Sequence, residues 1–325
     1  MKVLVAGGAG YIGSCTVEYL LEKGHEVAVY DALLNGHRAA VDSRAKFYYG
    51  NLADTNELNR VMMDFLPEGV IHFAAFIEVG ESMKDPGKYF TNNVGNAINL
   101  AEAAARAKVR KLVFSSTAAV YGTPKTVPIN ENMPTEPINA YGRTKLMFEQ
   151  VLEWYKKIYG MQYTALRYFN AAGATRFRGE DHHPETHLIP LVIQAAMGVR
   201  PSISIFGTNY KTPDGTCIRD YVHVLDLAQA HLLALEKDGS DAFNLGSGKG
   251  YSVREVIDTV RKVSGREFAV KEEARRPGDP DALIADSTKA KNTLGWRPQY
   301  DNLETIVRSA WEWRQEHPNG YDDKT

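Results

Sequence analysis

The chain opens with Met1-Lys2-Val3-Leu4-Val5-Ala6-Gly7-Gly8-Ala9-Gly10-Tyr11-Ile12-Gly13, and this stretch decides the fold. The apolar run Lys2–Ala6 predicts a buried strand, and the glycines after it predict a tight turn into a helix. The spacing Gly-x-x-Gly-x-x-Gly, counted from Gly7, lets a pyrophosphate approach the helix N-terminus. The stretch therefore predicts a dinucleotide site.

An acidic residue completes this pattern. Asp31 follows the next predicted strand, Glu26–Tyr30, and its carboxylate can accept hydrogen bonds from a pair of ribose hydroxyls. The same negative charge repels a 2′-phosphate, so NAD is favoured over NADP. A strand-to-helix turn without a ligand is the alternative. The strand before the turn, the helix after it and the acid favour the nucleotide site.

The first half of the chain alternates short apolar runs with helical patterns. This alternation predicts an α/β fold with a doubly wound, Rossmann-type parallel sheet. Further strands are expected at Phe47–Gly50, Val70–Ala74 and Leu112–Ser116, and helices at Tyr11–Lys23, Asn92–Ala107 and Tyr141–Tyr159.

After Asn170 the sequence pattern changes. We expect residues 1–170 to form the dinucleotide-binding domain and residues 171–325 a smaller, mixed α/β domain for the substrate. The segment at about 221–247 is expected to cross back to the large sheet. Helices are predicted at 188–197, 225–237, 253–263 and 303–316, and strands at 204–206, 220–224 and 242–245.

Composition limits the partners. The 325 residues are 44% hydrophobic, which is ample for a large core, and the formal net charge of −2 gives no reason to expect nucleic acid or a membrane surface. The first apolar run is too short for a signal peptide, and no stretch is long enough to span a bilayer. Two cysteines favour reduced thiols and a cytoplasmic setting.

Tyr141 and Lys145 are the candidate catalytic pair, one turn apart on one face of a predicted helix. A free phenol has a pKa of about 10 and is a poor base at neutral pH. A nearby ammonium and the positive nicotinamide ring of NAD favour the phenolate. A pKa near 7 requires about 4 kcal/mol of such stabilisation. On its own, this spacing is usually a surface pair.

The glycine motif, the Tyr141/Lys145 pair and Phe114-Ser115-Ser116-Thr117-Ala118-Ala119-Val120-Tyr121-Gly122 resemble the extended short-chain dehydrogenase/reductase family in order and spacing. Thr117 matches the hydroxyl residue of that family's catalytic triad. Related dehydratases of nucleotide sugars typically carry Asp-Glu after this threonine. Ala118 and Ala119 stand there in this chain and offer no acid for water elimination, which favours an epimerase.

The resemblance covers essentially the whole chain. The segments 167–170, 215–224, 244–246 and 275–279 look like those of UDP-galactose 4-epimerases. This likeness implies inversion of C4 of a UDP-hexose (UDP-galactose and UDP-glucose) through a transient 4-keto sugar. Tyr141 takes the proton of the 4-hydroxyl, hydride passes to NAD, and it returns to the opposite face after the ketone has turned.

The family likeness also implies the contact residues. Arg219 and Arg276 match diphosphate contacts, Tyr221 and Asp279 match contacts near the uridine ribose, and Phe206 lies where uracil is held. The substrate set is Thr117, Tyr141, Asn170, His187, Leu188, Phe206, Arg219, Tyr221, Arg276 and Asp279. The NAD set is Gly7, Gly10, Tyr11, Ile12, Gly13, Asp31, Asn35, Asn51, Leu52, Phe73, Ala74, Asn93, Tyr141, Lys145 and Tyr168.

Three positions depart from the family pattern. Ile77 replaces a lysine near the nicotinamide ribose, and Asn51 replaces an aspartate at the adenine edge. Leu283 occupies a position where some epimerases carry tyrosine and others a small residue, a side chain thought to limit N-acetylated sugars. A UDP-N-acetylglucosamine, UDP-pentose or UDP-glucuronate 4-epimerase is therefore the alternative function. A catalytically silent NAD-binding protein is a further alternative.

Three histidines raise the question of a metal site. His182, His183 and His187 lie in a charged loop, which favours a solvated loop over a metal site, so no metal is predicted.

The oligomeric state is a separate question. Apolar residues of the helices 92–107 and 141–159 extend beyond one stripe. They predict a homodimer through a four-helix bundle, as in related epimerases, with burial inside one chain as the alternative.

Overall fold

The computed structural model describes residues 1–276 and 278–321. Within these residues, seven parallel strands form the large sheet in the order β3-β2-β1-β4-β5-β6-β10. The order reverses between β1 and β4, where doubly wound sheets bind their ligands. The predicted doubly wound fold is confirmed. The strands are β1 (Lys2–Ala6), β2 (Glu26–Asp31), β3 (Lys46–Tyr49), β4 (Gly69–His72), β5 (Lys111–Thr117), β6 (Gln162–Tyr168) and β10 (Asp241–Leu245).

Helices cover both faces of this sheet. Val3 and Val5 of β1 join the core with α1 (Tyr11–Glu22) and α8 (Val224–Glu236). The alternate residues Leu4 and Ala6 join the opposite core. The helices of that second core are α2 (Thr55–Phe65), α5 (Ala97–Arg106) and α6 (Ala140–Tyr159). A strand buried on both faces needs apolar side chains at every position, which explains the continuous run in β1.

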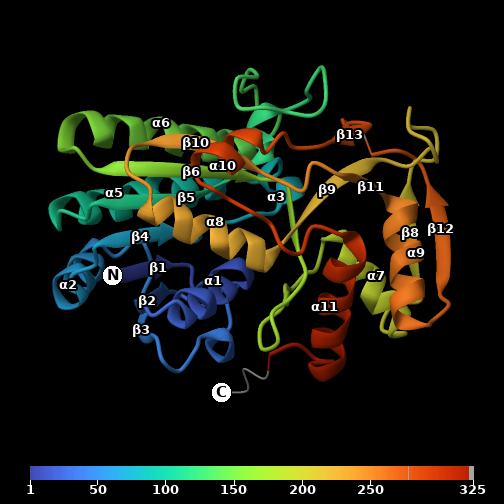
Figure 1. Ribbon diagram of the computed structural model, residues 1–325, viewed down its shortest axis with the longest axis horizontal. Helices are drawn as coiled ribbons and strands as arrows, with labels where there is room; N and C mark the ends of the chain where they lie inside the picture. The colour runs from blue at the N-terminus through green and yellow to red at the C-terminus, as the bar shows by residue number, and fades with distance from the viewer. Residues whose placement is uncertain (277, 322–325) are drawn as a thin grey trace.

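A smaller part lies beside the large sheet, on the right of Figure 1. In it β8 pairs with β12, and β9 pairs with β7, β11 and β13. Its helices α7, α9 and α11 share one apolar core. The bounds are β7 (Asn170–Ala172), α7 (Leu188–Ala196), β8 (Ser202–Phe206), β9 (Ile218–His223), β11 (Gly250–Ser252), α9 (Val253–Ser264), β12 (Ala269–Glu273), β13 (Ala282–Leu283) and α11 (Leu303–Glu316).

The chain returns to the large sheet after β9. Helix α8 packs on α1, and β10 runs parallel to β6 with Asp241 opposite Thr164. Strand β9 pairs within the smaller part, so the return begins at Val224. The domain boundary at residue 170 stays a prediction.

Some elements differ from the expectations. Helix α2 and strand β6 were not predicted, and the expected helix 92–107 divides into a π-helical turn, Thr91–Asn96, and α5. Short elements complete the description: η1 (Arg38–Ala40), α3 (Val79–Ser82), α4 (Pro86–Phe90), η3 (Ala118–Tyr121) and α10 (Thr288–Thr293). Over residues 1–276 and 278–321, every helix is too short or too polar to span a bilayer.

Candidate functional site

The glycine turn joins β1 to α1 at the carboxyl edge of the sheet. Gly7 has φ +82°, and its amide donates to the carbonyl of Tyr30 at 2.9 Å. A Cβ on Gly13 would overlap the carbonyl oxygen of Gly7, and one on Gly7 would overlap the backbone of Ala74. Only glycine permits this approach. Gly10 caps α1 without a side chain, so the first amides of the helix are available to a phosphate.

Asp31 lies at the end of β2 beside this turn. Its two carboxylate oxygens accept the amides of Ala9 at 2.9 Å and of Leu33 at 2.8 Å. Burial raises the pKa of the Asp31 carboxyl, and these two amides oppose that shift. Each oxygen keeps a second lone pair, which can accept a ribose hydroxyl. The glycine turn and Asp31 therefore fit NAD.

The remaining NAD candidates line the ends of neighbouring strands. The amides of Phe73 and Ala74 donate to the carbonyl of Ala6, at 2.8 and 3.1 Å, and so continue β4 beside β1. Asn93 is buried and exchanges two hydrogen bonds of 2.9 Å with the backbone of Phe76. Its amide therefore holds the segment after β4 in place.

On the far side of Asp31, Asn51 and Leu52 follow β3. The Asn51 side-chain oxygen accepts the amide of Ala53 at 2.9 Å, and the Leu52 carbonyl accepts the Asn99 amide at 3.0 Å. Asn35 is exposed. Tyr11 and Ile12 form the first turn of α1, and the Tyr11 hydroxyl donates to the carbonyl of Gly173 at 2.5 Å.

The catalytic candidates meet at the ends of β5 and β6. Thr117 ends β5, Tyr141 and Lys145 lie in the first turns of α6, and the Tyr168 hydroxyl hydrogen-bonds the hydroxyl of Ser115. The Lys145 ammonium donates to the Ser115 carbonyl at 2.9 Å and stands 5.8 Å from the centre of the Tyr141 ring. Lys145 is therefore buried and Tyr141 half-buried at the sheet edge, unlike a surface pair.

Burial dominates the electrostatics of the catalytic pair. Burial raises the pKa of Tyr141 to about 12, and its interaction with the Thr117 hydroxyl only partly opposes the shift. Burial also lowers the pKa of Lys145 to about 7, although Glu149 raises it. The phenol of the chain alone therefore keeps its proton, and the expected support of the phenolate by Lys145 together with the nicotinamide ring of NAD stays a prediction.

The substrate candidates of the smaller part form two contacts. The Arg219 guanidinium pairs with the Asp279 carboxylate and donates to the Pro280 carbonyl at 3.1 Å. The Arg276 guanidinium lies 4.0 Å from the centre of the Phe206 ring. Both arginines thus contact groups that the sequence had assigned to the uridine. A bound diphosphate would compete for these guanidinium groups.

Further candidates lie on β7, β9 and β13. Asn170 stands opposite Tyr221, and its side-chain amide donates to the Asp220 carbonyl at 2.9 Å. Leu283 stands opposite Arg219 and packs against the cluster that includes Val120 and Leu146. Leu283 therefore connects the arginine to the segment that follows Thr117.

The loop before α7 differs from its predicted state. The side chains of Glu180 and Glu185 are only 8% and 6% exposed, and they contact His187, the N-cap residue of α7, at 2.8 and 3.0 Å. The expectation of a solvated loop is wrong for these side chains. His187 and Leu188 remain at the start of α7, where the sequence placed a substrate contact.

Sequence reasoning missed several residues that hold the site together. The Ser82 hydroxyl accepts the amide of Tyr141 at 3.2 Å, and the Tyr210 hydroxyl donates to the Phe206 carbonyl at 3.2 Å and to Asp279 at 3.3 Å. Asp220 is fully buried and accepts three amides from two separate segments, those of Ser247, Gly248 and Ala285. The sequence signal for Asp220 was its charge, between Arg219 and Tyr221 on β9.

Comparison with known proteins decides the family. Residues 3–246 match the NAD dependent epimerase/dehydratase family. The chain belongs to this family. NAD is the cofactor of the epimerase/dehydratase family, in agreement with the fit of the glycine turn and Asp31.

Relatives within the family cover the whole chain. A UDP-glucose 4-epimerase of Streptococcus mutans is 52% identical over 100% of both chains. The structure of UDP-glucose 4-epimerase from Brucella ovis in complex with NAD is 47% identical, covers 95% of this chain and 97% of its own, and gives a TM-score of 0.93. That of the Bifidobacterium longum enzyme with NAD+ and UDP is 38% identical, covers 99% and 100%, and also gives 0.93. The predicted resemblance is confirmed.

Proposed function

We propose that this protein is an isomerase, an NAD-dependent 4-epimerase that interconverts UDP-galactose and UDP-glucose through a transient 4-keto sugar. The observation that carries the proposal is the group formed by buried Thr117 and Lys145 and half-buried Tyr141 at the carboxyl edge of the NAD-type sheet. Relatives of about 50% identity over their full lengths, named UDP-glucose 4-epimerase, support the substrate pair.

Tyr141 is the proposed base for the 4-hydroxyl proton. NAD, when bound, supplies the hydride acceptor for C4 and the positive charge of its nicotinamide ring. A phenol whose pKa is about 12 holds its proton firmly, so the phenolate needs a further cationic contribution in the loaded site. Thr117 interacts with the phenol and is positioned to orient the sugar hydroxyl toward it.

Lys145 is proposed to position this group. Its ammonium binds the carbonyl of Ser115 and lies between the rings of Phe114 and Tyr141, 5.0 and 5.8 Å from their centres. The lysine therefore fixes the first turns of α6 against the end of β5. Proton transfer requires such a fixed geometry, because donor and acceptor must stay within hydrogen-bond reach.

The residues after Thr117 favour epimerisation over dehydration. The Thr117 hydroxyl accepts the amide of Ala119 at 3.1 Å, and the segment 118–121 continues as a short 3₁₀ helix. Ala118 and Ala119 carry no acid to protonate a leaving hydroxyl. Elimination of water requires such an acid, whereas return of the hydride to the opposite face does not.

The oligomeric state and the cellular compartment are part of the proposal. Helix α6 exposes Met147, Trp154 and Ile158 on one face, which supports a homodimer through this helix. Cys15 and Cys217 are free, buried thiols, which supports work in a reducing compartment such as the cytoplasm.

A single experiment tests the function. The purified chain is incubated with UDP-galactose without added NAD, and the sugar is followed by proton NMR. The expected result is UDP-glucose appearing until the ratio of the two sugars is constant, since a redox-neutral reaction lets NAD stay bound. Failure to convert this sugar, even with added NAD, overturns the proposed substrate pair. N-acetylated, pentose and glucuronate nucleotides would then be tested in the same assay.

A further inference from the structure

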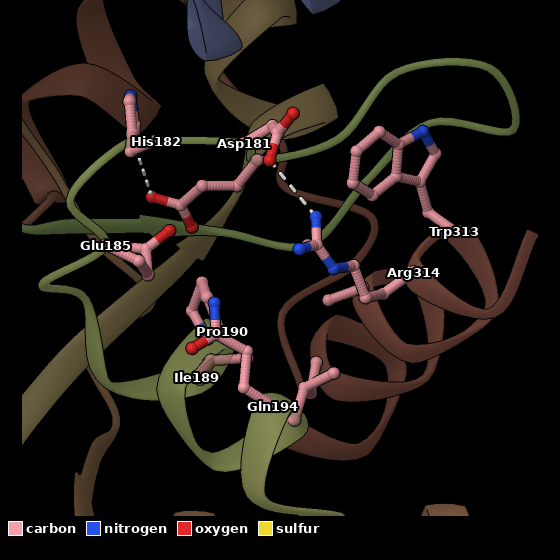
Figure 2. A pocket seen from close by; sticks show the side chains of 12 residues that line it. Asp181, His182, Glu185, Ile189, Pro190, Gln194, Trp313 and Arg314 are labelled. Atoms are coloured by element: carbon pink, nitrogen blue, oxygen red, sulfur yellow. Dashed lines mark hydrogen bonds and ion pairs between the residues drawn. The ribbon is translucent and has the colours of Figure 1, made fainter. Parts of the chain in front are cut away.

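Four metal-ligating side chains converge in the loop that leads into α7. Glu180, His182, Glu185 and His187 each offer one ligand atom, and these four atoms lie within 4.8 Å of one another. The Nδ1 atom of His187 is 2.8 Å from Glu180 Oε1 and 3.0 Å from Glu185 Oε1. The Nδ1 atom of His182 is 3.2 Å from the same Glu180 oxygen. Figure 2 shows the His182 and Glu185 side chains converging from two sides of this loop.

The spacing of the atoms suits a small tetrahedral cation. Zinc binds imidazole nitrogen and carboxylate oxygen at about 2.0–2.2 Å, which places neighbouring ligand atoms roughly 3.3 Å apart. The measured separations of 2.8, 3.0 and 3.2 Å are close to this value. The four donors therefore need only small movements to surround one ion.

The charge and burial of these four side chains also favour a bound divalent cation. The Glu180 and Glu185 side chains are almost fully removed from solvent. Buried carboxylates need a compensating positive charge. Metal binding requires both imidazoles in their neutral form, and the four donors then carry a charge of −2, which a divalent cation balances. Imidazole donors favour zinc and its neighbours in the transition series over magnesium or calcium.

The loop backbone is held by the Glu185 carboxylate, which accepts the amides of Thr186 and His187 at 2.7 and 2.8 Å, and also by contacts outside the four side chains. Asp181 lies between two of them in sequence but points toward α11, where it accepts from Arg314 at 3.2 Å and from the amide of Tyr321 at 2.9 Å. Figure 2 shows the ion pair of Asp181 with Arg314. On the other side, the Tyr11 ring packs edge-on against His182, with centres 6.4 Å apart. The donors are thus mounted on an anchored loop.

We propose that Glu180, His182, Glu185 and His187 bind one Zn²⁺ ion. The ion ties the loop to the N-terminus of α7, which begins directly after His187. Its role is structural, because all four donors of a tetrahedral site come from the protein. The site shares His187 with the predicted substrate contacts but none of the catalytic residues Thr117, Tyr141 and Lys145, so the proposal does not depend on the proposed reaction.

Metal analysis of the full-length protein tests this site. The chain is purified, incubated with Zn²⁺, and dialysed against metal-free buffer before its zinc content is measured by mass spectrometry. We expect one zinc per chain, and competition with a chromophoric chelator gives its affinity. The double variant His182→Asn with Glu185→Gln should bind zinc at least about 100-fold more weakly.

His183→Asn is the matched control. His183 belongs to the same loop, but its side chain is 72% exposed and lies outside the cluster. This variant should retain one zinc with unchanged affinity. Equal zinc binding by the double variant and the control would overturn the proposal, as would wild-type protein that retains no stoichiometric zinc. In that case the four groups form an ion-pair cluster only.

A measurement on the wild type alone tests the site even if the double variant fails to fold. X-ray absorption at the zinc edge should give two nitrogen and two oxygen ligands at about 2.0–2.2 Å. A sulfur ligand or a shell made of water oxygens would place the ion elsewhere and refute this site.

Discussion

Tyr141 and Lys145 have different roles although they lie one turn apart. Burial opposes the charged form of both side chains, raising the pKa of the phenol to about 12 and lowering that of the ammonium to about 7. The protein alone therefore holds the phenol protonated and weakens the charge of the lysine. The charge that shifts the phenol toward its reactive form has to come from the cofactor, since the chain supplies little of it.

Tyr141→Phe removes the proposed base and little else. We expect kcat for UDP-galactose to fall by about 100- to 10,000-fold, while the bound NAD per chain stays unchanged. Turnover is measured by NMR, and NAD is released by denaturation and quantified. Tyr89→Phe serves as the control, since this buried phenol bonds Glu81 on a neighbouring helix rather than Thr117. Near-normal turnover in Tyr141→Phe would refute the role of the phenol.

The lowered pKa of Lys145 predicts how the free energy of unfolding depends on pH. An unfolded lysine keeps its proton up to its ordinary pKa of 10.5, whereas folded Lys145 loses it above about 7. Between these values the unfolded state binds more protons, so the folded state gains stability as the pH rises. Relative to Lys145→Met, the wild type should gain roughly 2 kcal/mol in free energy of unfolding between pH 7 and pH 9.

Denaturant unfolding at several pH values measures this difference. Lys156→Met, which replaces an exposed lysine of the same helix, is the control and should follow the wild type. Parallel stability curves for wild type and Lys145→Met would contradict the lowered pKa.

At the scale of elements, helices and strands that depend on residues adjacent in sequence could be predicted, whereas those that depend on distant contacts could not. The glycine turn and the helix α6 follow from residues adjacent in sequence. Helix α2 was missed although Leu58, Val61, Met62 and Phe65 repeat at helical spacing and Asp54 accepts the amides at its start. That signal was present in the sequence and was overlooked.

Strand β6 was hidden for a different reason. It carries Arg167 in its buried part, where the guanidinium pairs with Glu149 of α6 at 2.5 Å. A charged residue inside a strand breaks the apolar pattern, and only its partner from another element makes the strand possible.

The candidate site shows the same division. Asp31 and the Tyr141/Lys145 pair could be assigned from spacing. The pairing of Arg219 with Asp279, and the burial of Glu180 behind a loop held by Arg314, could not. These contacts join segments 60 and 133 residues apart. Sequence spacing carries no information on such distant contacts until the fold is known.

The short strand β13 carries a prediction about the substrate. Leu283 packs near Val120 and Leu146 and stands opposite Arg219, between the arginine and the residues after Thr117. Leu283→Tyr adds an aromatic ring at this position. We expect it to lower kcat/KM for UDP-N-acetylglucosamine about 10-fold or more relative to UDP-glucose, because a methylene-sized clash costs about 1–3 kcal/mol.

Leu283→Met is the volume-conserving control and should keep the wild-type ratio of the two activities. Both sugars are assayed with each variant by NMR. An unchanged ratio in Leu283→Tyr would show that this position does not select the sugar.

At the scale of the whole molecule, the two parts divide the work. The large sheet fits NAD at its switch point, and the smaller part carries Phe206, Arg219 and Arg276, which we propose as contacts of the nucleotide. The chain returns to the large sheet through α8 and β10 (Figure 1) and again through α10, so several crossings rather than one linker join the two parts. Several connections of this kind hold the proposed nucleotide-contact residues at a fixed position relative to Thr117, Tyr141 and Lys145.

The outer face of α6 carries the last prediction, that two chains associate through this helix. Ile158 is 66% exposed there, close to the exposed Trp154 and Met147. If the face is an interface, Ile158→Glu buries one carboxylate from each chain against the other, and both desolvation and like-charge repulsion oppose pairing. Light scattering should give twice the mass of the 36.1 kDa chain for the wild type and the single-chain mass for the variant.

Val199→Glu provides a matched comparison, because Val199 is 63% exposed but follows α7 in the smaller part. Its mass should equal that of the wild type. If Ile158→Glu and Val199→Glu gave the same mass, the exposed face of α6 would not be where the chains meet. A wild type of single-chain mass would mean that these side chains remain in contact with water, at a cost in solubility that a charged substitution would relieve.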